Sequence, residues 1–336
     1  MCAADVRADR LCDERDGAPF AGPRQFVVSL AMGLRVCALL VLLSCSDGGI
    51  AATNNARAFD GGRAFRDLVK QCAFGARIPG AKAHDSCEHW LAEQLRGCGA
   101  EVTVDRFTES INGHTVSFAN IEADFNPAGR RRVVLCAHWD SKPTADEDPD
   151  PAKRAAPMPG ANDGASGVAV LLEIGRALKA KPPRDRVTLV LFDGEDYGTT
   201  TDTMFFGSRR FARRYHGPAI SWAVLLDMVG DRDLRIPKEQ ISLTSARGVV
   251  GRVWKAAADV DAKAFVEARG PAILDDHVLL LQHGIPCVDV IDFDYPYWHT
   301  TADTPDKCSA ESLEQVGRTV LRTISDFESE GDQKGQ

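Results

Sequence analysis

The sequence lacks several features that would assign it to a particular class of protein. Its 336 residues include ten cysteines but no Cys-x-x-Cys pair, so neither a thiolate zinc site nor a dithiol redox motif is expected. It also lacks an excess of basic residues, because its net charge is -8, and this argues against nucleic-acid binding. After the first fifty residues no apolar run is long enough to span a membrane, and no internal repeat is visible.

What is present is the composition of an ordinary globular protein. Hydrophobic residues make up 44% of the chain and charged residues 26%, and both values are typical of globular domains. A chain of this length is sufficient for one large α/β domain or for two smaller domains.

The first fifty residues differ from the rest. A basic start at Arg24, a short apolar run over 36–43 and small residues after it are typical of a signal peptide. Cys45 directly follows a Leu-Leu-Ser sequence, which resembles a bacterial lipobox, and Cys45 would then carry a lipid anchor. A plain signal peptide cleaved near residue 51 explains the segment equally well. Both interpretations predict an exported protein, periplasmic or extracellular.

Six cysteines follow this leader. An exported protein can carry one or two disulfides, and Cys72, Cys87 and Cys98 are the nearest candidates. Cys136 and Cys287 lie within apolar, strand-like runs, so they are expected to be small buried hydrophobic residues.

Strand-like and helix-like segments alternate through the rest of the chain. Short continuous apolar runs predict buried strands at 133–137, 187–192, 222–226 and 286–291. More alternating segments predict strands at 101–108 and 115–123. Helical spacing predicts two helices within 61–99 and others at 164–180, 208–215 and 310–327. The pattern predicts one α/β domain, with a central mixed, mostly parallel sheet flanked by helices on both faces. We divide the chain into a leader and linker (1–53), this domain (54–330) and a polar tail (331–336).

Acidic residues and histidines follow each predicted buried strand. They are His138 and Asp140, then Asp193, Glu195 and Asp196, then Asp227, and finally His299 after a loop rich in aromatic residues. Asp163 and the Asp275-Asp276-His277 sequence each precede a predicted helix, where an aspartate is ordinarily a helix N-cap. Each of these residues therefore has an ordinary structural explanation when it is considered alone.

Considered together, these residues indicate a metal site. The carboxyl ends of parallel strands lie on one edge of a sheet, so several carboxylates would crowd together there. Like charges repel strongly unless a cation or shared protons intervene. Histidine among the ligands favours zinc over magnesium.

Six segments, in this order, resemble the zinc-dependent exopeptidase superfamily that contains aminopeptidases and glutaminyl cyclases. They are AHWDSK at 137–142, GANDGASG at 160–167, FDGEDYG at 192–198, DMVG at 227–230, DDH at 275–277 and WHT at 298–300. FGARIPG at 74–80 is similar to the N-terminal motif of the family, so the resemblance extends from about residue 74 to residue 327. The Asp275-Asp276 doublet before His277, and Trp298 directly before His299, resemble glutaminyl-peptide cyclotransferases, in particular the bacterial form related to the animal enzymes.

The resemblance implies an enzyme that converts the N-terminal glutamine of peptides or proteins to pyroglutamate and releases ammonia. It implies one zinc ion held by Asp163, Asp196 and His299. It also implies roles for four further residues: Glu195 as general acid and base, Asp227 and Asp275 as further catalytic acids that share a proton, and Trp298 as a wall of the substrate pocket.

One alternative stays open within the same superfamily. Aminopeptidases of this fold bind a second zinc through residues that correspond to His138 and Asp227, and this chain has both. A di-zinc aminopeptidase that removes N-terminal residues from peptides is therefore the second hypothesis. The chain also departs from the family at Asp196, where the animal cyclases and most of the peptidases carry glutamate.

Overall fold

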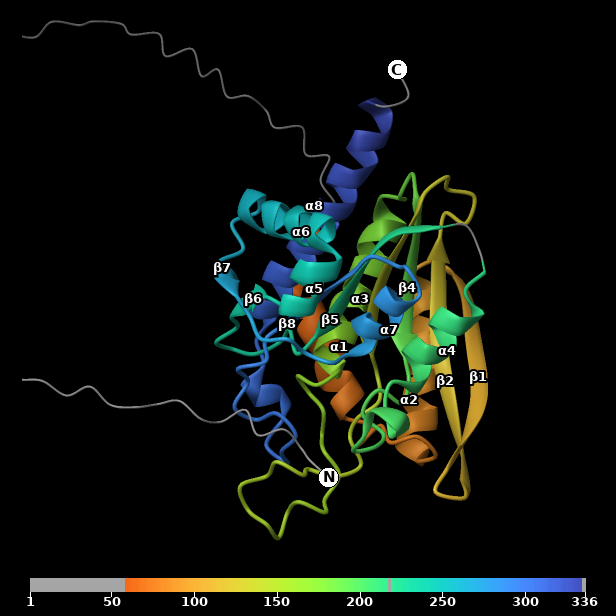
Figure 1. Ribbon diagram of the computed structural model, residues 1–336, viewed down its shortest axis with the longest axis vertical. Helices are drawn as coiled ribbons and strands as arrows, with labels where there is room; N and C mark the ends of the chain where they lie inside the picture. Colours follow the sequence, from red (N-terminus) through yellow and green to blue (C-terminus); the bar gives the residue numbers. More distant parts are fainter. Residues whose placement is uncertain (1–57, 217–218, 334–336) are drawn as a thin grey trace, which may run out of the picture. The chain divides into compact units, whose positions relative to one another are not determined.

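The computed structural model describes residues 58–216 and 219–333 (Figure 1). The predicted leader, with Cys45, lies outside the described residues. None of the described helices is long and apolar enough to cross a membrane.

Within these residues the chain forms eight α-helices, eight strands and two short 3-10 helices. The α-helices are α1 (Gly61–Cys72), α2 (Lys82–Gly97), α3 (Ala165–Ala180), α4 (Phe206–Arg214), α5 (Gln240–Ser245), α6 (Arg247–Asp259), α7 (Asp276–Gln282) and α8 (Ala310–Gln333). The strands are β1 (Glu101–Ile111), β2 (His114–Phe125), β3 (Arg132–His138), β4 (Arg186–Phe192), β5 (Ile220–Asp227), β6 (Ile236–Lys238), β7 (Phe265–Arg269) and β8 (Cys287–Ile291). The 3-10 helices are η1 (Thr201–Thr203) and η2 (Pro305–Lys307).

Six of the strands form one mixed sheet in the order β1-β2-β4-β3-β5-β8. Strand β3 is parallel to both β4 and β5, and β8 is parallel to β5. Strand β2 is antiparallel to its neighbours β1 and β4. The four parallel strands are the four that the apolar runs predicted to be buried, so the predicted mixed, mostly parallel sheet is confirmed.

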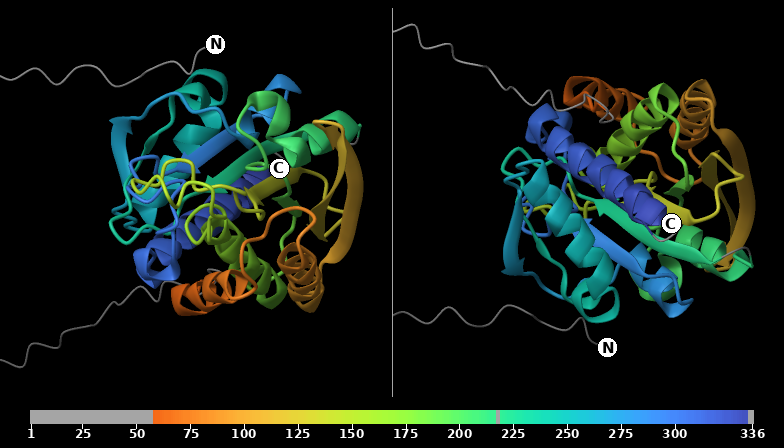
Figure 2. Two further views of the ribbon diagram at one scale, coloured as in Figure 1. Left: turned by 90° about the horizontal axis from the view of Figure 1, so that it is seen from below. Right: turned by 90° about the horizontal axis from the view of Figure 1, so that it is seen from above.

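Helices cover both faces of this sheet (Figure 2). The face that carries Leu135, Leu189 and Val224 packs into the main core with α1, α2, α3 and α8. The opposite face carries Val134 and Cys136 and packs against α4 and α7. Because neighbouring residues of a strand point to opposite faces, a strand covered on both sides has to be apolar throughout.

Helix α3 lies unusually close to the sheet. A Cβ atom at Gly167 would lie 2.2 Å from the carbonyl oxygen of Leu226 in β5, so only glycine permits this approach. The close contact brings the start of α3, and with it Asp163 just before the helix, against the carboxyl end of β5. The packing of one helix thus fixes the position of one predicted site residue.

Four elements between residues 236 and 269 were not predicted from the sequence. Strands β6 and β7 form a separate parallel pair, and α5 and α6 lie between them along the chain. Helix α6 does have a helical repeat of buried residues at Val249, Val250, Val253 and Trp254. Glycines interrupt this repeat and lower the helix propensity, so the helix was not recognised from the sequence. Helix α4 begins two residues before its predicted start, and α8 continues past its predicted end at residue 327 to Gln333.

The disulfide expectation is wrong for the described part of the chain, where all six cysteines are free. Cys87 lies within α2 and Cys98 directly after its end. Eleven residues of helix separate their Cα atoms by about 16 Å, whereas a disulfide needs them within about 7 Å. Cys136 and Cys287 are fully buried, as predicted.

Candidate active site

The polar residues that follow the parallel strands do come together. His138 is the last residue of β3 and Asp227 the last residue of β5. Glu195 and Asp196 lie in the loop after β4, and His299 in the loop after β8. Because these strands are parallel neighbours, their carboxyl ends lie on one edge of the sheet. The predicted convergence of carboxylates and histidines is therefore observed.

His299 faces two aspartates. Its Nε2 atom lies 3.3 Å from Asp196 Oδ1 and 3.7 Å from Asp163 Oδ2, and all three residues are buried. Burial opposes a charge on this histidine, but the carboxylates of Asp196 and Asp146 outweigh it and raise the pKa of His299 to about 10. The backbone of His299 is left-handed, with φ 54°, a conformation that is uncommon outside glycine and concentrated at functional sites.

His138 faces the same Asp163 from the other side. Its Nε2 atom lies 3.0 Å from Asp163 Oδ1 and 3.2 Å from Asp227 Oδ1. The ring packs directly on Gly164, because a Cβ atom there would lie 2.3 Å from His138 Nε2. Burial opposes a charge on His138, but the carboxylates of Asp140, Asp163 and Asp227 outweigh it, and its pKa is raised well above its ordinary value. Asp163 therefore contacts both histidines, one with each of its carboxylate oxygens.

Asp140 fixes the loop that carries the next two acids. Its carboxylate accepts hydrogen bonds from the backbone N–H groups of Glu195 and Asp196, each at 3.2 Å. Glu195 is buried, and its Oε2 atom lies 3.8 Å from His138 Nδ1. Burial, and then the charge of Asp196, raise the pKa of Glu195 well above its ordinary value. A carboxyl group with a raised pKa can both accept and release a proton near neutral pH.

Asp275 has two roles in the structure. Its side chain accepts a hydrogen bond from the backbone N–H of Asp276 and so caps α7, as an ordinary helix N-cap would. It also lines the same cavity as Asp227. Burial, and then the charge of Asp227, raise the pKa of Asp275 well above its ordinary value. The shared proton expected for Asp227 and Asp275 stays a prediction.

These acids line one cavity of about 310 Å³. Trp298 stacks on the imidazole of His299, with ring centroids 3.9 Å apart and planes at 22°. The ring of Phe293 lies 5.1 Å from that of Trp298, and Met228 and Ile291 complete this apolar side. The cavity is thus lined by both acidic and apolar side chains, and Trp298, which the resemblance implied as a wall of the substrate pocket, is among the apolar ones.

Two further charged residues contact this group and were not predicted. Lys142 Nζ lies 3.5 Å from Asp196 Oδ1 with its side chain only 2% exposed, and Asp146 Oδ1 lies 3.1 Å from His299 Nδ1. Burial opposes ionisation of Asp196, but His299 and Lys142 outweigh it, and the pKa of Asp196 is lowered. Lys142 belongs to the AHWDSK motif, so its place in the sequence could have indicated a role at the site. Asp146 lies in the Pro- and Asp-rich segment 143–159, which has no periodic pattern that would have marked it.

Two buried residues hold the loops of the site in place. Arg77, from the FGARIPG segment, is fully buried and donates hydrogen bonds to three backbone carbonyls of the adjoining loops. Asp303 accepts hydrogen bonds from the backbone N–H groups of Asn162 and Asp163, at 2.9 and 3.2 Å, and from the Tyr295 hydroxyl at 2.7 Å. Neither role was predicted, although Arg77 lies in a motif that the resemblance had singled out.

The group formed by Asp163, Asp196 and His299 fits a zinc ion. Each residue offers one ligand atom, and these atoms lie within 4.8 Å of one another. Asp196 Oδ2 is buried and has no hydrogen-bond partner, which is unusual for a carboxylate oxygen unless a cation satisfies it. Two aspartates and a histidine are ligand types that zinc prefers. His138, Asp163 and Asp227 also bring three ligand atoms within 4.8 Å.

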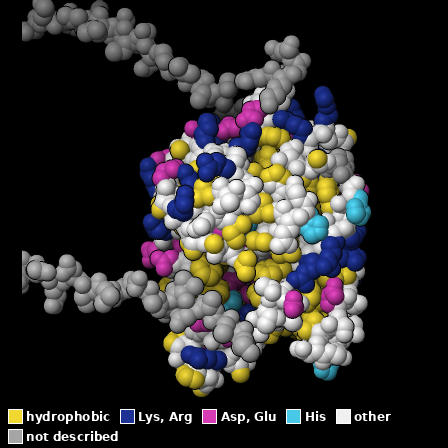
Figure 3. Space-filling view, viewed as in Figure 1, with side chains coloured by type: hydrophobic (Ala, Val, Ile, Leu, Met, Phe, Trp, Pro, Cys, Tyr) yellow, Lys and Arg dark blue, Asp and Glu magenta, His cyan; other side chains and the backbone are white. Residues whose placement is uncertain are grey.

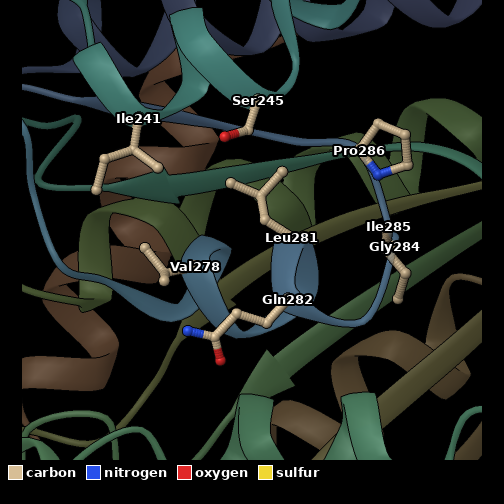
Figure 4. A pocket seen from close by; sticks show the side chains of 8 residues that line it. All are labelled: Ile241, Ser245, Val278, Leu281, Gln282, Gly284, Ile285 and Pro286. Carbon is tan, nitrogen blue, oxygen red and sulfur yellow. The ribbon is translucent and has the colours of Figure 1, made fainter.

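Two other parts of the described surface differ from this cavity. A hollow of about 340 Å³ lies between α5 and α7, and none of the eight residues that line it is ionisable (Figure 4). On the face drawn in Figure 3, hydrophobic side chains gather across the middle, and the Lys and Arg side chains lie in separate groups with acidic ones near them. This face has no continuous basic surface of the kind that nucleic acids need.

Known proteins of similar structure and sequence include cyclases and exopeptidases. Tannerella forsythia glutaminyl cyclase is 40% identical, with a TM-score of 0.76 over 80% of this chain and 98% of that protein. A Zn-dependent exopeptidase from Parabacteroides distasonis is 38% identical, with a TM-score of 0.77 over 79% of this chain and 98% of that protein. The glutaminyl-peptide cyclotransferase-like protein of Bos taurus is 25% identical over 284 residues, which cover 75% of this chain and 72% of that protein.

These similarities confirm the predicted resemblance and the zinc-exopeptidase type of fold, and they support zinc as the metal. The family model for peptidase family M28 matches residues 120–324, a range that contains every predicted site residue. The chain belongs to peptidase family M28.

Proposed function

We propose that this protein is a zinc-dependent glutaminyl-peptide cyclotransferase, which converts an N-terminal glutamine to pyroglutamate and releases ammonia. The observation that carries the proposal is the single cavity that is lined by Glu195 and Asp275 together with the stacked pair Trp298 and His299. It offers apolar side chains that can pack against a substrate side chain, and buried acids for proton transfer. The names of the Tannerella and Bos taurus relatives support the same activity.

Glu195 is the proton carrier in this proposal. It accepts a proton from the α-amine of the substrate as the amine nitrogen forms a bond to the side-chain carbonyl carbon, which closes the ring. The bond from that carbon to the amide nitrogen then breaks, and Glu195 returns the proton so that ammonia leaves. No water is consumed, and the burial of Glu195 suits a reaction that gains from the exclusion of water.

Three further residues act on the same substrate. Asp227 and Asp275 share a proton and orient the side-chain amide, which the raised pKa of Asp275 supports. Trp298 packs against the glutamine side chain and limits the pocket to one residue.

Asp163, Asp196 and His299 would hold one zinc ion, which acts when bound as a Lewis acid toward a carbonyl oxygen. Two contrasting contacts support one ion rather than two. In the set formed by His138, Asp163 and Asp227 (the His138 group), the Nε2 atom of His138 already lies within hydrogen-bond distance of both aspartates. In the set formed by His299, Asp163 and Asp196 (the His299 group), one oxygen of Asp196 has no hydrogen-bond partner.

The direct test is ammonia release from a peptide that begins with glutamine, with mass spectrometry of the product. A product that has lost one ammonia without becoming shorter supports the proposal. A product shortened by one residue would establish the alternative, a di-zinc aminopeptidase in which His138 and Asp227 hold the second ion. Metal analysis of the same sample, giving one or two zinc ions per chain, checks the assignment independently.

We also propose that the protein is exported, because of the signal-like leader in the sequence. The lipobox-like position of Cys45 adds a lipid anchor to this proposal. Mass spectrometry of the mature N-terminus distinguishes a lipidated Cys45 from a plain cleavage near residue 51. An intact leader on the mature protein would contradict export.

A further inference from the structure

A buried histidine and aspartate lie behind the loop that carries Glu195. His84 Nε2 lies 3.0 Å from Asp193 Oδ1 and 2.9 Å from Asp193 Oδ2. Asp193 is fully buried, and the side chain of His84 is only 4% exposed. Asp193 directly follows β4 and precedes Glu195 by two residues. The pair therefore holds the start of the loop that enters the site, although the proposed reaction uses neither residue.

The same pair also contacts the loop after β3. The ring of His84 stacks on the indole of Trp139, with ring centroids 4.2 Å apart and planes at 27°, and Trp139 is the first residue after β3. The indole N–H of Trp139 donates to the carbonyl oxygen of Ala119 in β2 at 3.0 Å. The backbone N–H of Ala119 in turn donates to Asp193 Oδ2 at 2.6 Å. His84 thus joins helix α2 to both loops that supply proposed site residues.

The carboxylate of Asp193 depends on this histidine. Burial raises the pKa of Asp193 to about 6, although the hydrogen bond from His84 opposes this shift. The nearby charge of Asp140 acts in the same direction as burial. A buried carboxylate that loses a hydrogen-bond donor is strongly disfavoured. Without His84, Asp193 would have to take up a proton or move, and the loop with Glu195 would move with it.

His84 does not reach the substrate itself. It lines a different hollow, of about 350 Å³, between α2 and the hairpin of β1 and β2, and this hollow shares no lining residue with the cavity of Glu195. Nδ1 of His84 has no hydrogen-bond partner and lies 3.7 Å from Asp85 Oδ1. Among the described residues, the hydrogen bonds of the His84 ring therefore go to Asp193 alone.

We propose that His84 is a positioning residue, whose Nε2–H donor holds the carboxylate of Asp193 and thereby fixes the position of Glu195. Proton transfer needs a distance of about 2.6–3.2 Å between the two heavy atoms, and a misplacement of about 1 Å can cost about 100-fold in rate. A displaced Glu195 should therefore lower kcat more than it raises KM. The inference rests on the proposed function, because it concerns the acid that carries the proton.

The test compares two substitutions of His84. His84→Gln keeps an N–H donor for Asp193, whereas His84→Phe keeps a ring that can stack on Trp139 but removes the donor. We expect His84→Gln to keep kcat within about threefold of wild type, and His84→Phe to lower kcat by at least about tenfold with KM little changed. Zinc content should be the same in both, because the backbone N–H of Asp196 is still held by Asp140.

Leu91→Ala is the matched control for a loss of stability. Leu91 is fully buried in the same helix, so its truncation leaves a cavity and should lower the Tm. At a temperature where every variant is folded, kcat of Leu91→Ala should stay within about twofold of wild type. A loss of kcat as large as that in His84→Phe would overturn the proposal, because any weakening of α2 would then have the same effect.

Two further kinetic results would overturn the proposal. One is a kcat for His84→Phe within about twofold of wild type, and the other is a loss in His84→Gln as large as that in His84→Phe. Proton NMR gives a readout independent of activity: the buried Nε2–H of wild type should give a signal downfield of the amide region that His84→Phe lacks. Absence of this signal from wild type would contradict the hydrogen bond, even if His84→Phe failed to fold. A wild type that shows the signal but releases no ammonia would instead contradict the proposed function.

Discussion

His138 and His299 make a natural comparison, because each faces Asp163 and each has a second carboxylate behind it. His138 Nδ1 lies 3.5 Å from Asp140, and His299 Nδ1 lies 3.1 Å from Asp146. On the side of Asp163 the two differ. His138 Nε2 has both facing carboxylates at hydrogen-bond distances of 3.0 and 3.2 Å, whereas those of His299 lie at 3.3 and 3.7 Å.

The difference suggests what each set of ligands can bind. A proton can satisfy the set of His138, Asp163 and Asp227, whereas the set of His299, Asp163 and Asp196 needs a cation. A single N–H of His138 can serve the facing oxygens of Asp163 and Asp227. In the His299 group one oxygen of Asp196 is left buried without a partner. Residue type alone does not separate the two groups, since each consists of two aspartates and a histidine.

The largest effect is expected at Glu195, which lies between the two groups. Glu195→Gln should lower kcat by about 10²- to 10⁴-fold, because general acid and base catalysis contributes about that much. Zinc content should not change, since Glu195 is not in the His299 group. Steady-state kinetics together with metal analysis checks this. Activity within a few-fold of wild type would remove Glu195 from the mechanism.

Substitution of the two histidines tests the comparison itself. His299→Ala should weaken zinc binding by more than about 100-fold, because even loss of a residue that only orients a ligand costs about 10- to 100-fold. His138→Asn should leave zinc binding nearly unchanged. Titration with a chelator that competes for zinc measures both. A fall from two ions to one in His138→Asn would favour the aminopeptidase hypothesis.

A third histidine, His277, extends the comparison through its partner Glu239. Interactions with His277 and backbone N–H groups outweigh burial and lower the pKa of Glu239 from 4.5 to about 2. Because the folded-state pKa is lowered, this stabilisation is complete above pH 4.5 and is lost as the pH falls toward 2. Wild type should exceed Glu239→Gln in free energy of unfolding by about 3 kcal/mol at pH 7, and by much less at pH 3. Urea unfolding of wild type and Glu239→Gln at pH 7 and at pH 3 measures the difference in free energy of unfolding. A difference that is the same at both pH values would contradict the prediction.

The smallest effect concerns the carboxylates behind the two histidines. Asp146→Asn should weaken zinc binding by about tenfold, at the low end of such effects, because its side chain is 40% exposed. Asp140→Asn is the matched comparison behind His138 and should leave zinc affinity nearly unchanged. Zinc affinity is measured by competition with a chelator. An equal loss of zinc affinity in Asp146→Asn and Asp140→Asn would show that the His138 and His299 groups do not differ in zinc binding.

The sequence predicted those parts of the site that depend on a regular pattern. The buried strands are continuous apolar runs, and in a parallel sheet their ends converge, so His138, Asp227 and the residues after β4 could be placed together. The family, the cyclase type and the fold are confirmed by the comparisons. The catalytic and metal-binding roles of individual residues stay predictions.

The parts that were missed come from segments without periodicity. Asp146 and Asp303 contact the site from loops whose path depends on tertiary contacts. His84 had no distinguishing signal either, because a histidine in the first turn of a helix shows nothing of what it faces. Lys142 and Arg77, by contrast, lie in recognised motifs, and their roles could have been inferred from the buried charge that each would need to share.

The hydrogen bond from the backbone of Asp163 to Asp303 joins residues 140 positions apart in the chain. Asp163 and His299, two members of the same proposed ligand set, are almost equally distant in sequence. Ribosomes release these segments in order, so a growing chain has no complete ligand set until the segment with His299 and Asp303 has emerged. The proposed zinc site is therefore complete only after nearly all of the chain has been made.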